Sequence, residues 1–255
     1  MKGKGVIKMS DMAKRREVLS RLRGGLIVSC QALEDEPLHS SAIMGRMAYA
    51  AMLGGACGIR ANTPQDIAAI KREVKLPIIG LTKRVFADSP VYITPTMREV
   101  DDLHEVGCDI IAMDATNRPH TGGLTIEALF AQARAKYPDQ LFMADVATFE
   151  EGVAAERMGF DLVSTTLSGY TADTAQGTLP DFRLMRSLSR TLTVPVIGEG
   201  GIWSPQDLRK AMEQGVFACV VGTAITRPRE ITRRFVEALA HQRCEEGDAD
   251  GYAAV

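Results

Sequence analysis

Short apolar runs alternate with amphipathic stretches along most of this chain. Each run holds four to six mostly apolar residues. Runs of this continuous kind are typical of strands in a parallel sheet that is covered on both faces. The sequence therefore predicts eight strands, at residues 26–30, 57–60, 77–81, 109–114, 141–145, 161–166, 195–198 and 216–221.

The stretches between these runs carry the start signals of helices. Ser204-Pro205-Gln206-Asp207 places a capping Ser before a Pro at the first helical position and an acid in the first turn. An additional helix is expected at 11–22, and its Val18, Leu19 and Leu22 could cover one end of the core. The other helices are expected at 40–53, from 64, and at 96–106, 124–136, 148–158, 181–190, from 205, and at 228–240.

Eight strands that alternate with helices favour an α/β fold of the (β/α)₈ TIM barrel type, with an N-terminal extra helix. A doubly wound sheet is the alternative. The barrel is favoured by a weak repeat of glycines before the even-numbered strands, Gly55, Gly107, Gly159 and Gly215, which lie 52, 52 and 56 residues apart. We expect one domain over 1–255, with a barrel core at about 24–240, a tail at 241–255, and a frayed end from 245.

The composition and net charge of the chain argue against nucleic acid and membranes as partners. The 255 residues carry a formal net charge of -2, with a pI near 6.1, so no global basic field is present to gather nucleic acid or an anionic membrane. No apolar stretch reaches the length of a signal segment or a membrane span, which predicts a cytoplasmic protein. The five cysteines, Cys30, Cys57, Cys108, Cys219 and Cys244, form no C-x-x-C pair and are expected to be free thiols.

In a barrel of this kind, chemistry belongs at the carboxyl ends of the strands. Polar residues follow nearly every predicted strand there, and they should converge on one mouth. Odd-numbered strands lead to Gln31, Lys83, Asp145 and Glu199, and even-numbered strands lead to Arg60, Asp114, Thr165-Thr166 and Gly222-Thr223.

Lys83 and Glu199 are the candidate catalytic pair. Lys83 follows an apolar strand, where loss of solvent and the neighbouring Arg60 would favour its neutral form, and a neutral lysine can accept a proton. Lys83 could instead be a surface lysine that pairs with an acid. Glu199 could be a partner of Lys83 or an acid-base group in its own right, and Asp145 either contacts substrate or supports the site from behind.

Two glycine turns predict an anion site. Gly200-Gly201 and Gly222-Thr223 follow the seventh and eighth strands, where barrels often bind a substrate phosphate through backbone N–H groups. Arg227 could add a charge-assisted contact, although an arginine at a helix start could also be simply solvated.

The motifs together resemble the N-acetylmannosamine-6-phosphate 2-epimerase family. The resemblance extends from Gly24 to about Leu239 and is carried by seven segments. These are Ser29-Cys30-Gln31-Ala32, Gly58-Ile59-Arg60-Ala61-Asn62, Ile79-Gly80-Leu81-Thr82-Lys83-Arg84, Ala112-Met113-Asp114-Ala115-Thr116, Met143-Ala144-Asp145-Val146-Ala147-Thr148, Leu167-Ser168-Gly169-Tyr170-Thr171 and Gly198-Glu199-Gly200-Gly201.

The resemblance implies a barrel enzyme of sialic acid catabolism that interconverts N-acetylmannosamine 6-phosphate and N-acetylglucosamine 6-phosphate without a metal or redox cofactor. Its catalytic lysine and glutamate fall on Lys83 and Glu199. Its substrate-contacting residues fall on Gln31, Arg60, Asp145 and Arg227. The expected partner is a small sugar phosphate, and the sequence leaves open whether the chain forms a homodimer.

Two other functions compete with this expectation. A Schiff-base aldolase would use Lys83 as a nucleophile on the same barrel. A sugar-phosphate-binding barrel without catalysis would leave the convergence of Lys83 and Glu199 unexplained. A metal-dependent epimerase is disfavoured because no histidine follows a predicted strand.

Overall fold

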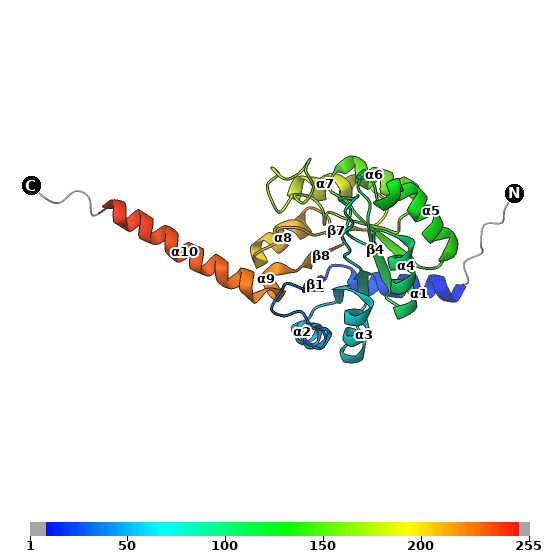
Figure 1. Ribbon diagram of the computed structural model, residues 1–255, viewed down its shortest axis with the longest axis horizontal. Helices are drawn as coiled ribbons and strands as arrows, with labels where there is room; N and C mark the ends of the chain where they lie inside the picture. Colours follow the sequence, from blue (N-terminus) through cyan, green and yellow to red (C-terminus); the bar gives the residue numbers. More distant parts are fainter. Residues whose placement is uncertain (1–8, 250–255) are drawn as a thin grey trace, which may run out of the picture.

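Eight parallel strands close into a barrel in which consecutive strands pair and the last strand pairs with the first (Figure 1). The computed structural model describes residues 9–249, with side chains over 12–239. The closed ring confirms the predicted (β/α)₈ barrel and excludes the doubly wound sheet. The strands are β1 (Leu26–Cys30), β2 (Gly58–Asn62), β3 (Ile78–Leu81), β4 (Ile110–Asp114), β5 (Leu141–Asp145), β6 (Leu162–Ser164), β7 (Val196–Gly198) and β8 (Ala218–Val221).

The helices lie outside the ring, and most begin at a capping side chain. Ser204 accepts a hydrogen bond from the Asp207 N–H, as the sequence predicts. Two short elements were not predicted, the 3₁₀ turn η1 (Thr121–Gly123) and helix α9 (Thr223–Thr226). The other helices are α1 (Met9–Leu22), α2 (Ser41–Leu53), α3 (Pro64–Glu73), α4 (Met97–Val106), α5 (Ile126–Lys136), α6 (Phe149–Met158), α7 (Phe182–Thr191), α8 (Pro205–Glu213) and α10 (Pro228–Ala249).

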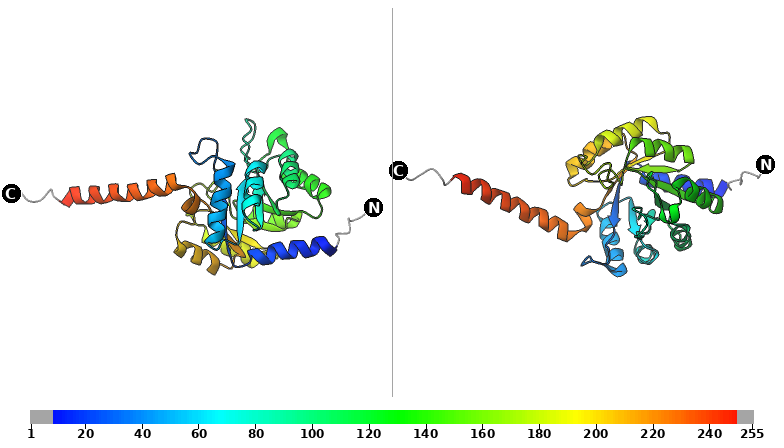
Figure 2. Two further views of the ribbon diagram at one scale, coloured as in Figure 1. Left: turned by 90° about the horizontal axis from the view of Figure 1, so that it is seen from below. Right: turned by 45° about the horizontal axis from the view of Figure 1, so that its top comes forward.

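Helix α1 closes the lower end of the barrel, as the spacing of its apolar residues predicts. Val18 and Leu22 are buried in the same cluster as the inward-facing strand residues. Leu22 fits there because Gly58 has no side chain: a Cβ on Gly58 would lie 2.5 Å from Leu22 Cδ2. Figure 2 (left) shows α1 running across this end, while the β1–α2 and β3–α4 loops rise from the opposite end.

The barrel interior changes from apolar to polar along its axis. Alternate strand residues point inward, and the lower layers hold side chains such as Ile27, Ile79 and Leu141. Each inward series ends at a polar residue or a glycine near the carboxyl end of its strand. The upper positions are Gln31, Asn62, Lys83, Asp114, Asp145, Thr166, Glu199 and Gly222.

Helix α10 extends away from the barrel instead of packing against it (Figures 1 and 2). It runs from Pro228 to Ala249, so the predicted frayed end from 245 is wrong for residues 245–249, where the helix continues through Gly247. Residues 250–255 of the predicted tail lie outside the described part of the chain. Within the described residues, no helix is both long and apolar enough to cross a membrane.

Candidate active site

A cavity of about 210 Å³ opens at the carboxyl ends of the strands. It is lined by nine of the ten residues that the sequence places in the catalytic, substrate-binding and phosphate-binding sets. They come from five of the strands and the segments that follow them. The nine are Gln31, Arg60, Lys83, Glu199, Gly200, Gly201, Gly222, Thr223 and Arg227.

Arg60 and Asp145 form a buried ion pair at the floor of this cavity. The two guanidinium Nη atoms donate to the two carboxylate oxygens at 2.6 and 3.1 Å, and the side chains are 1% and 0% exposed. Burial opposes the charge on Arg60, but Asp145 and Glu199 more than offset it, so the pKa of Arg60 lies above its ordinary value. Arg60 therefore brings a fixed positive charge to the cavity.

Three sequence expectations change in the structure. Arg60 lies in the middle of β2 and reaches the cavity by pointing inward, because the strand extends two residues further than expected. Asp145 is the one predicted substrate-contacting residue that does not line the cavity, since it lies behind Arg60. Asp114, also predicted at the mouth, is fully buried and pairs with Arg118 at 2.7 Å.

Lys83 meets the cavity from the segment after β3. Its backbone N–H donates to Asn62 Oδ1 at 2.8 Å, which fixes the chain where it leaves the strand. Burial, helped by the positive charges of Arg60 and Arg227, lowers the pKa of Lys83 to about 8. The neutral fraction of this amine near physiological pH is therefore far larger than that of an ordinary lysine, as a proton acceptor requires.

Glu199 enters the cavity from the end of β7, and its side chain is 15% exposed. Thr165 fixes its backbone, because the Thr165 hydroxyl and the Glu199 main chain exchange hydrogen bonds of 2.7 and 3.0 Å. Arg60 Nη1 lies 3.1 Å from Glu199 Oε2. Burial raises the pKa of Glu199 above its usual range, against the opposing effect of Arg60 and with a further contribution from Asp145.

The turn after β7 presents free backbone donors. The N–H groups of Gly200 and Gly201 make no hydrogen bond to any group in residues 9–249. Both glycines have positive φ, 105° and 69°, and a Cβ on Gly201 would lie 2.4 Å from the Cβ of Leu179. The backbone angle favours glycine at both positions, and the close approach of the β6–α7 loop leaves no room for a side chain at Gly201.

Arg227 lies at the end of α9 on the rim of the cavity. Its Nη2 is 3.1 Å from Glu36 Oε1, in the β1–α2 loop. Glu36 is nearly buried and also accepts a hydrogen bond from the Leu33 N–H at 2.9 Å. The carboxylate therefore holds Arg227 in place at the rim, and the sequence pattern did not indicate it.

Gln31 offers an unused polar atom. Its side-chain nitrogen donates to Ser29 Oγ at 2.9 Å, whereas its buried Oε1 has no hydrogen-bond partner among the described residues. A buried acceptor without a partner is costly in a protein interior. A donor group on a bound molecule could satisfy it.

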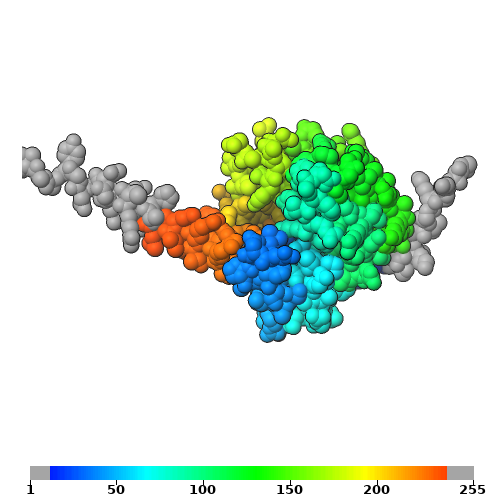
Figure 3. All heavy atoms as spheres, in the orientation of Figure 1, coloured from blue at the N-terminus to red at the C-terminus, as the bar shows by residue number. Residues whose placement is uncertain are grey.

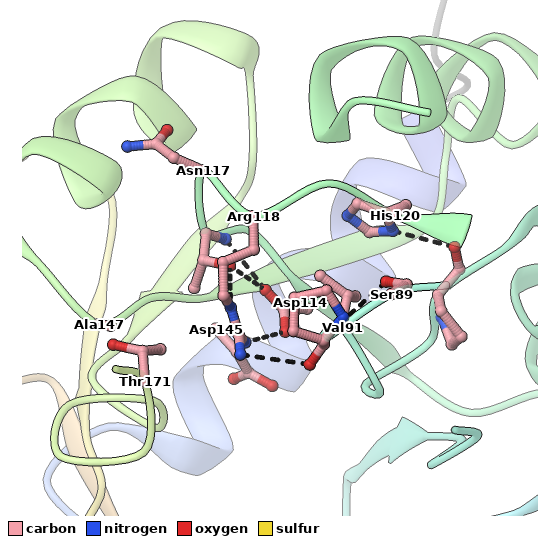
Figure 4. A network of polar contacts seen from close by, with 12 residues as sticks. Ser89, Val91, Asp114, Asn117, Arg118, His120, Asp145, Ala147 and Thr171 are labelled. Carbon is pink, nitrogen blue, oxygen red and sulfur yellow. Dashed lines mark hydrogen bonds and ion pairs between the residues drawn. The ribbon is translucent and has the colours of Figure 1, made fainter. Parts of the chain in front are cut away.

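The β3–α4 loop adds Tyr92 and Ile93 to the cavity lining. Arg118 fixes this loop, since it donates to the Pro90 carbonyl at 3.2 Å while it pairs with Asp114 (Figure 4). Ser89 donates to the Pro119 carbonyl at 2.8 Å. Tyr92 and Ile93 could not be predicted as site residues because they lie in a long loop rather than at a strand end.

The match to known proteins covers most of the chain. A family model described as "Putative N-acetylmannosamine-6-phosphate epimerase" matches residues 44–241. A protein of Caldanaerobacter subterraneus named "Putative N-acetylmannosamine-6-phosphate 2-epimerase" is 54% identical over 227 residues, which are 89% of this chain and 96% of that protein. A Listeria monocytogenes protein of the same name is 47% identical over 90% of this chain and 98% of its own length.

Solved structures agree with this match. The N-acetylmannosamine-6-phosphate 2-epimerase of Clostridium perfringens is 50% identical, with a TM-score of 0.83 over 92% of this chain and 100% of that one. Thiamine phosphate pyrophosphorylase of Pyrococcus furiosus, at 18% identity and a TM-score of 0.57, shares the fold alone. These similarities confirm the family resemblance that the motifs indicate.

Proposed function

Because the chain belongs to the N-acetylmannosamine-6-phosphate epimerase family, we propose that it interconverts N-acetylmannosamine 6-phosphate and N-acetylglucosamine 6-phosphate. The reaction inverts the configuration at C2 of the sugar. Its C2 proton must leave and a proton must return to the opposite face. In the open-chain form the adjacent C1 carbonyl can take up the resulting charge as an enolate. The site therefore needs a base, a stabiliser of the C1 oxyanion and an anchor for the phosphate.

One observation carries the proposal: a lysine of lowered pKa and a glutamate of raised pKa line the same cavity as a buried arginine. In this proposal neutral Lys83 handles the C2 proton. Glu199 acts as its acid-base partner, in ring opening or at O1. Arg60, which stays charged because Asp145 compensates it from behind, stabilises the negative oxygen.

The same proposal assigns the phosphate to the glycine turns. Gly200 and Gly201 offer free N–H groups after β7, and Gly222 and Thr223 follow β8 on the same cavity. This is the part of a barrel where phosphates are often bound. Arg227 at the rim adds a positive charge within reach of an anion, and Gln31 offers its free acceptor to a hydroxyl or amide of the sugar.

Solvent exchange at C2 tests the reaction. In deuterium oxide, N-acetylmannosamine 6-phosphate should lose its C2 proton signal as the epimer forms. NMR spectra recorded over time measure this loss. Lys83→Ala should abolish both exchange and turnover, whereas Lys210→Ala on the outer face of α8 should leave them unchanged. A Lys83→Ala enzyme with near-normal turnover would overturn the assignment of Lys83.

The competing functions give different results in the same assay. A Schiff-base aldolase would be trapped as a covalent adduct on Lys83 by borohydride, and it would cleave a carbon–carbon bond of the sugar phosphate. A binding barrel would bind the sugar phosphate with no exchange at C2. Either result would replace the epimerase proposal.

We also propose that the chain forms a homodimer through α10. Phe235, Val236 and Leu239 lie within two turns of this helix and are 72%, 58% and 61% exposed. Figure 3 shows the helix standing clear of the barrel. A lone helix gains most of its stability from an apolar face packed against a partner, and a second copy would bury this face reciprocally.

A cytoplasmic location completes the proposal. Cys30, Cys108 and Cys219 are free and buried, and Cys57 is free and partly buried. Thiols of this kind suit a reducing compartment.

A further inference from the structure

The hydroxyl of Thr166 lies between two carboxylates at the cavity floor. Its Oγ1 is 2.7 Å from Asp145 Oδ1 and 3.0 Å from Glu199 Oε2. Ser164 Oγ lies 2.8 Å from the same oxygen. Thr166 therefore joins the supporting carboxylate to the one that we assign to chemistry.

The number of protons decides what this contact can do. A threonine hydroxyl has one proton to donate, and its oxygen can accept others. When Thr166 donates to Asp145, Glu199 completes a hydrogen bond to Thr166 only by donating a proton of its own. When Thr166 turns its proton toward Glu199, the hydrogen bond fits an ionised Glu199. The two orientations of one O–H bond thus match the two protonation states of Glu199.

The charged groups around Glu199 cannot supply this alternation. Arg60 from β2 favours the ionised form only, Asp145 from β5 favours the protonated form only, and Lys83 after β3 favours the ionised form when it is charged. Arg60 is locked by its two hydrogen bonds to Asp145 and cannot accept a proton. Thr166 lies within hydrogen-bond distance of Glu199, at 3.0 Å, and its hydroxyl can both donate and accept.

We propose that Thr166 is a positioning residue for Glu199, which turns its hydroxyl between Asp145 and Glu199 and so holds the catalytic carboxyl in place in both protonation states. The inference rests on the proposed function, because it gives Glu199 an acid-base role. In one half of the cycle Glu199 gives up its proton to substrate, and the Thr166 O–H turns from Asp145 to the new carboxylate. When Glu199 takes a proton back, the O–H returns to Asp145, so protons balance over the cycle.

Thr166→Val removes the hydroxyl with little change of shape. We expect kcat to fall by about tenfold to a hundredfold, no more than the smallest usual contribution of acid-base catalysis because Glu199 itself remains, with KM nearly unchanged. Thr166→Ser keeps the hydroxyl and should restore most of kcat. Thr171→Val is the matched control, because Thr171 is a buried threonine of the β6–α7 loop whose hydroxyl contacts Thr174 Oγ1 at 2.8 Å and does not line the cavity.

A direct readout separates positioning from a general structural defect. Glutamate labelled with carbon-13 at its carboxyl lets NMR follow the titration of Glu199, assigned by loss of its signal in Glu199→Gln. The hydrogen bond from Thr166 on balance lowers the pKa of Glu199, so Glu199 should titrate at higher pH in Thr166→Val than in the wild type and in Thr166→Ser.

An unchanged titration together with an unchanged kcat in Thr166→Val would overturn the inference. So would a Thr166→Ser enzyme as impaired as Thr166→Val, because the hydroxyl would then not be the cause. If the wild type showed no exchange at C2, the proposed function would fail first. The NMR titration would still show in that case whether Thr166 sets the protonation of Glu199.

Discussion

The guanidinium of Arg60 and the carboxylate of Asp145 face each other through two hydrogen bonds beneath the cavity, with almost no contact with solvent. The two residues come from β2 and β5, and both point into the barrel. Removal of the acid would leave a buried arginine with one remaining carboxylate, Glu199, at 3.1 Å. The pair therefore links the stability of the barrel to the charge at its active site.

Asp145→Ala should lower the free energy of unfolding by about 3–5 kcal/mol, the usual cost of breaking a buried ion pair from one side. Urea denaturation measures it. Asp101→Ala is the matched control, because Asp101 pairs with Lys136 on the surface and its loss should cost about 0–1 kcal/mol. Equal losses in the two variants would contradict the structural role of Asp145.

The pH dependence of kcat/KM should report Lys83. The amine must be neutral to take the C2 proton, and its pKa is lowered to about 8, so kcat/KM should rise with pH and level off above about 8. Arg227→Gln removes a nearby positive charge, which raises the pKa of Lys83. The rising limb of the pH profile of kcat/KM should therefore move to higher pH. Arg229→Gln should leave the limb in place, since Arg229 pairs with Glu36 and Glu230 and does not line the cavity. A limb that does not move in Arg227→Gln would argue against Lys83 as its source.

Gly201→Ala tests the phosphate turn. An alanine there meets both an unfavourable φ and the backbone of Leu179, so the turn must shift and KM for the sugar phosphate should rise at least tenfold. Gly123→Ala has a similar φ of 72° with open space around it, and it should cost stability without a change in KM. Unphosphorylated N-acetylmannosamine should be a far poorer substrate of the wild type. Equal kcat/KM for the two sugars would rule out a phosphate site.

Changes on α10 should alter the oligomeric state. Phe235→Asp combined with Leu239→Asp places two charges on the exposed apolar face, and light scattering should then give the mass of a monomer. Glu237→Gln on the same helix should keep the dimer. A wild-type chain that is already monomeric at micromolar concentration would refute the proposed dimer.

The barrel could be predicted because its signals are local. Each apolar run and each cap can be recognised within a few residues, and the bounds of β1 and β5 match the prediction in full. The direction of α10 could not be predicted in this way. The sequence shows a helix after β8, but whether that helix folds back on the barrel depends on contacts between residues far apart. That the whole chain forms one domain stays a prediction.

The sequence predicts those site residues that lie at strand ends or within recognisable motifs. Lys83 and Glu199 follow strands directly, and period-two alternation places both in the cavity. Glu36 and Tyr92 lie in loops, where no period fixes the direction of a side chain. Asp145 was placed correctly in the barrel, but its depth behind Arg60 depends on a contact between two strands that are not neighbours.

The fit of Leu22 beside Gly58 has a consequence for the route by which molecules reach the cavity. Apolar side chains fill the lower layers of the barrel and α1 covers them, so the cavity opens only at the carboxyl ends of the strands and a sugar phosphate must enter and leave past that rim. Bulk water has that one route as well. The loops at the rim are therefore the part of the fold that controls access to the cavity, while α1 and the apolar layers above it keep the far end closed.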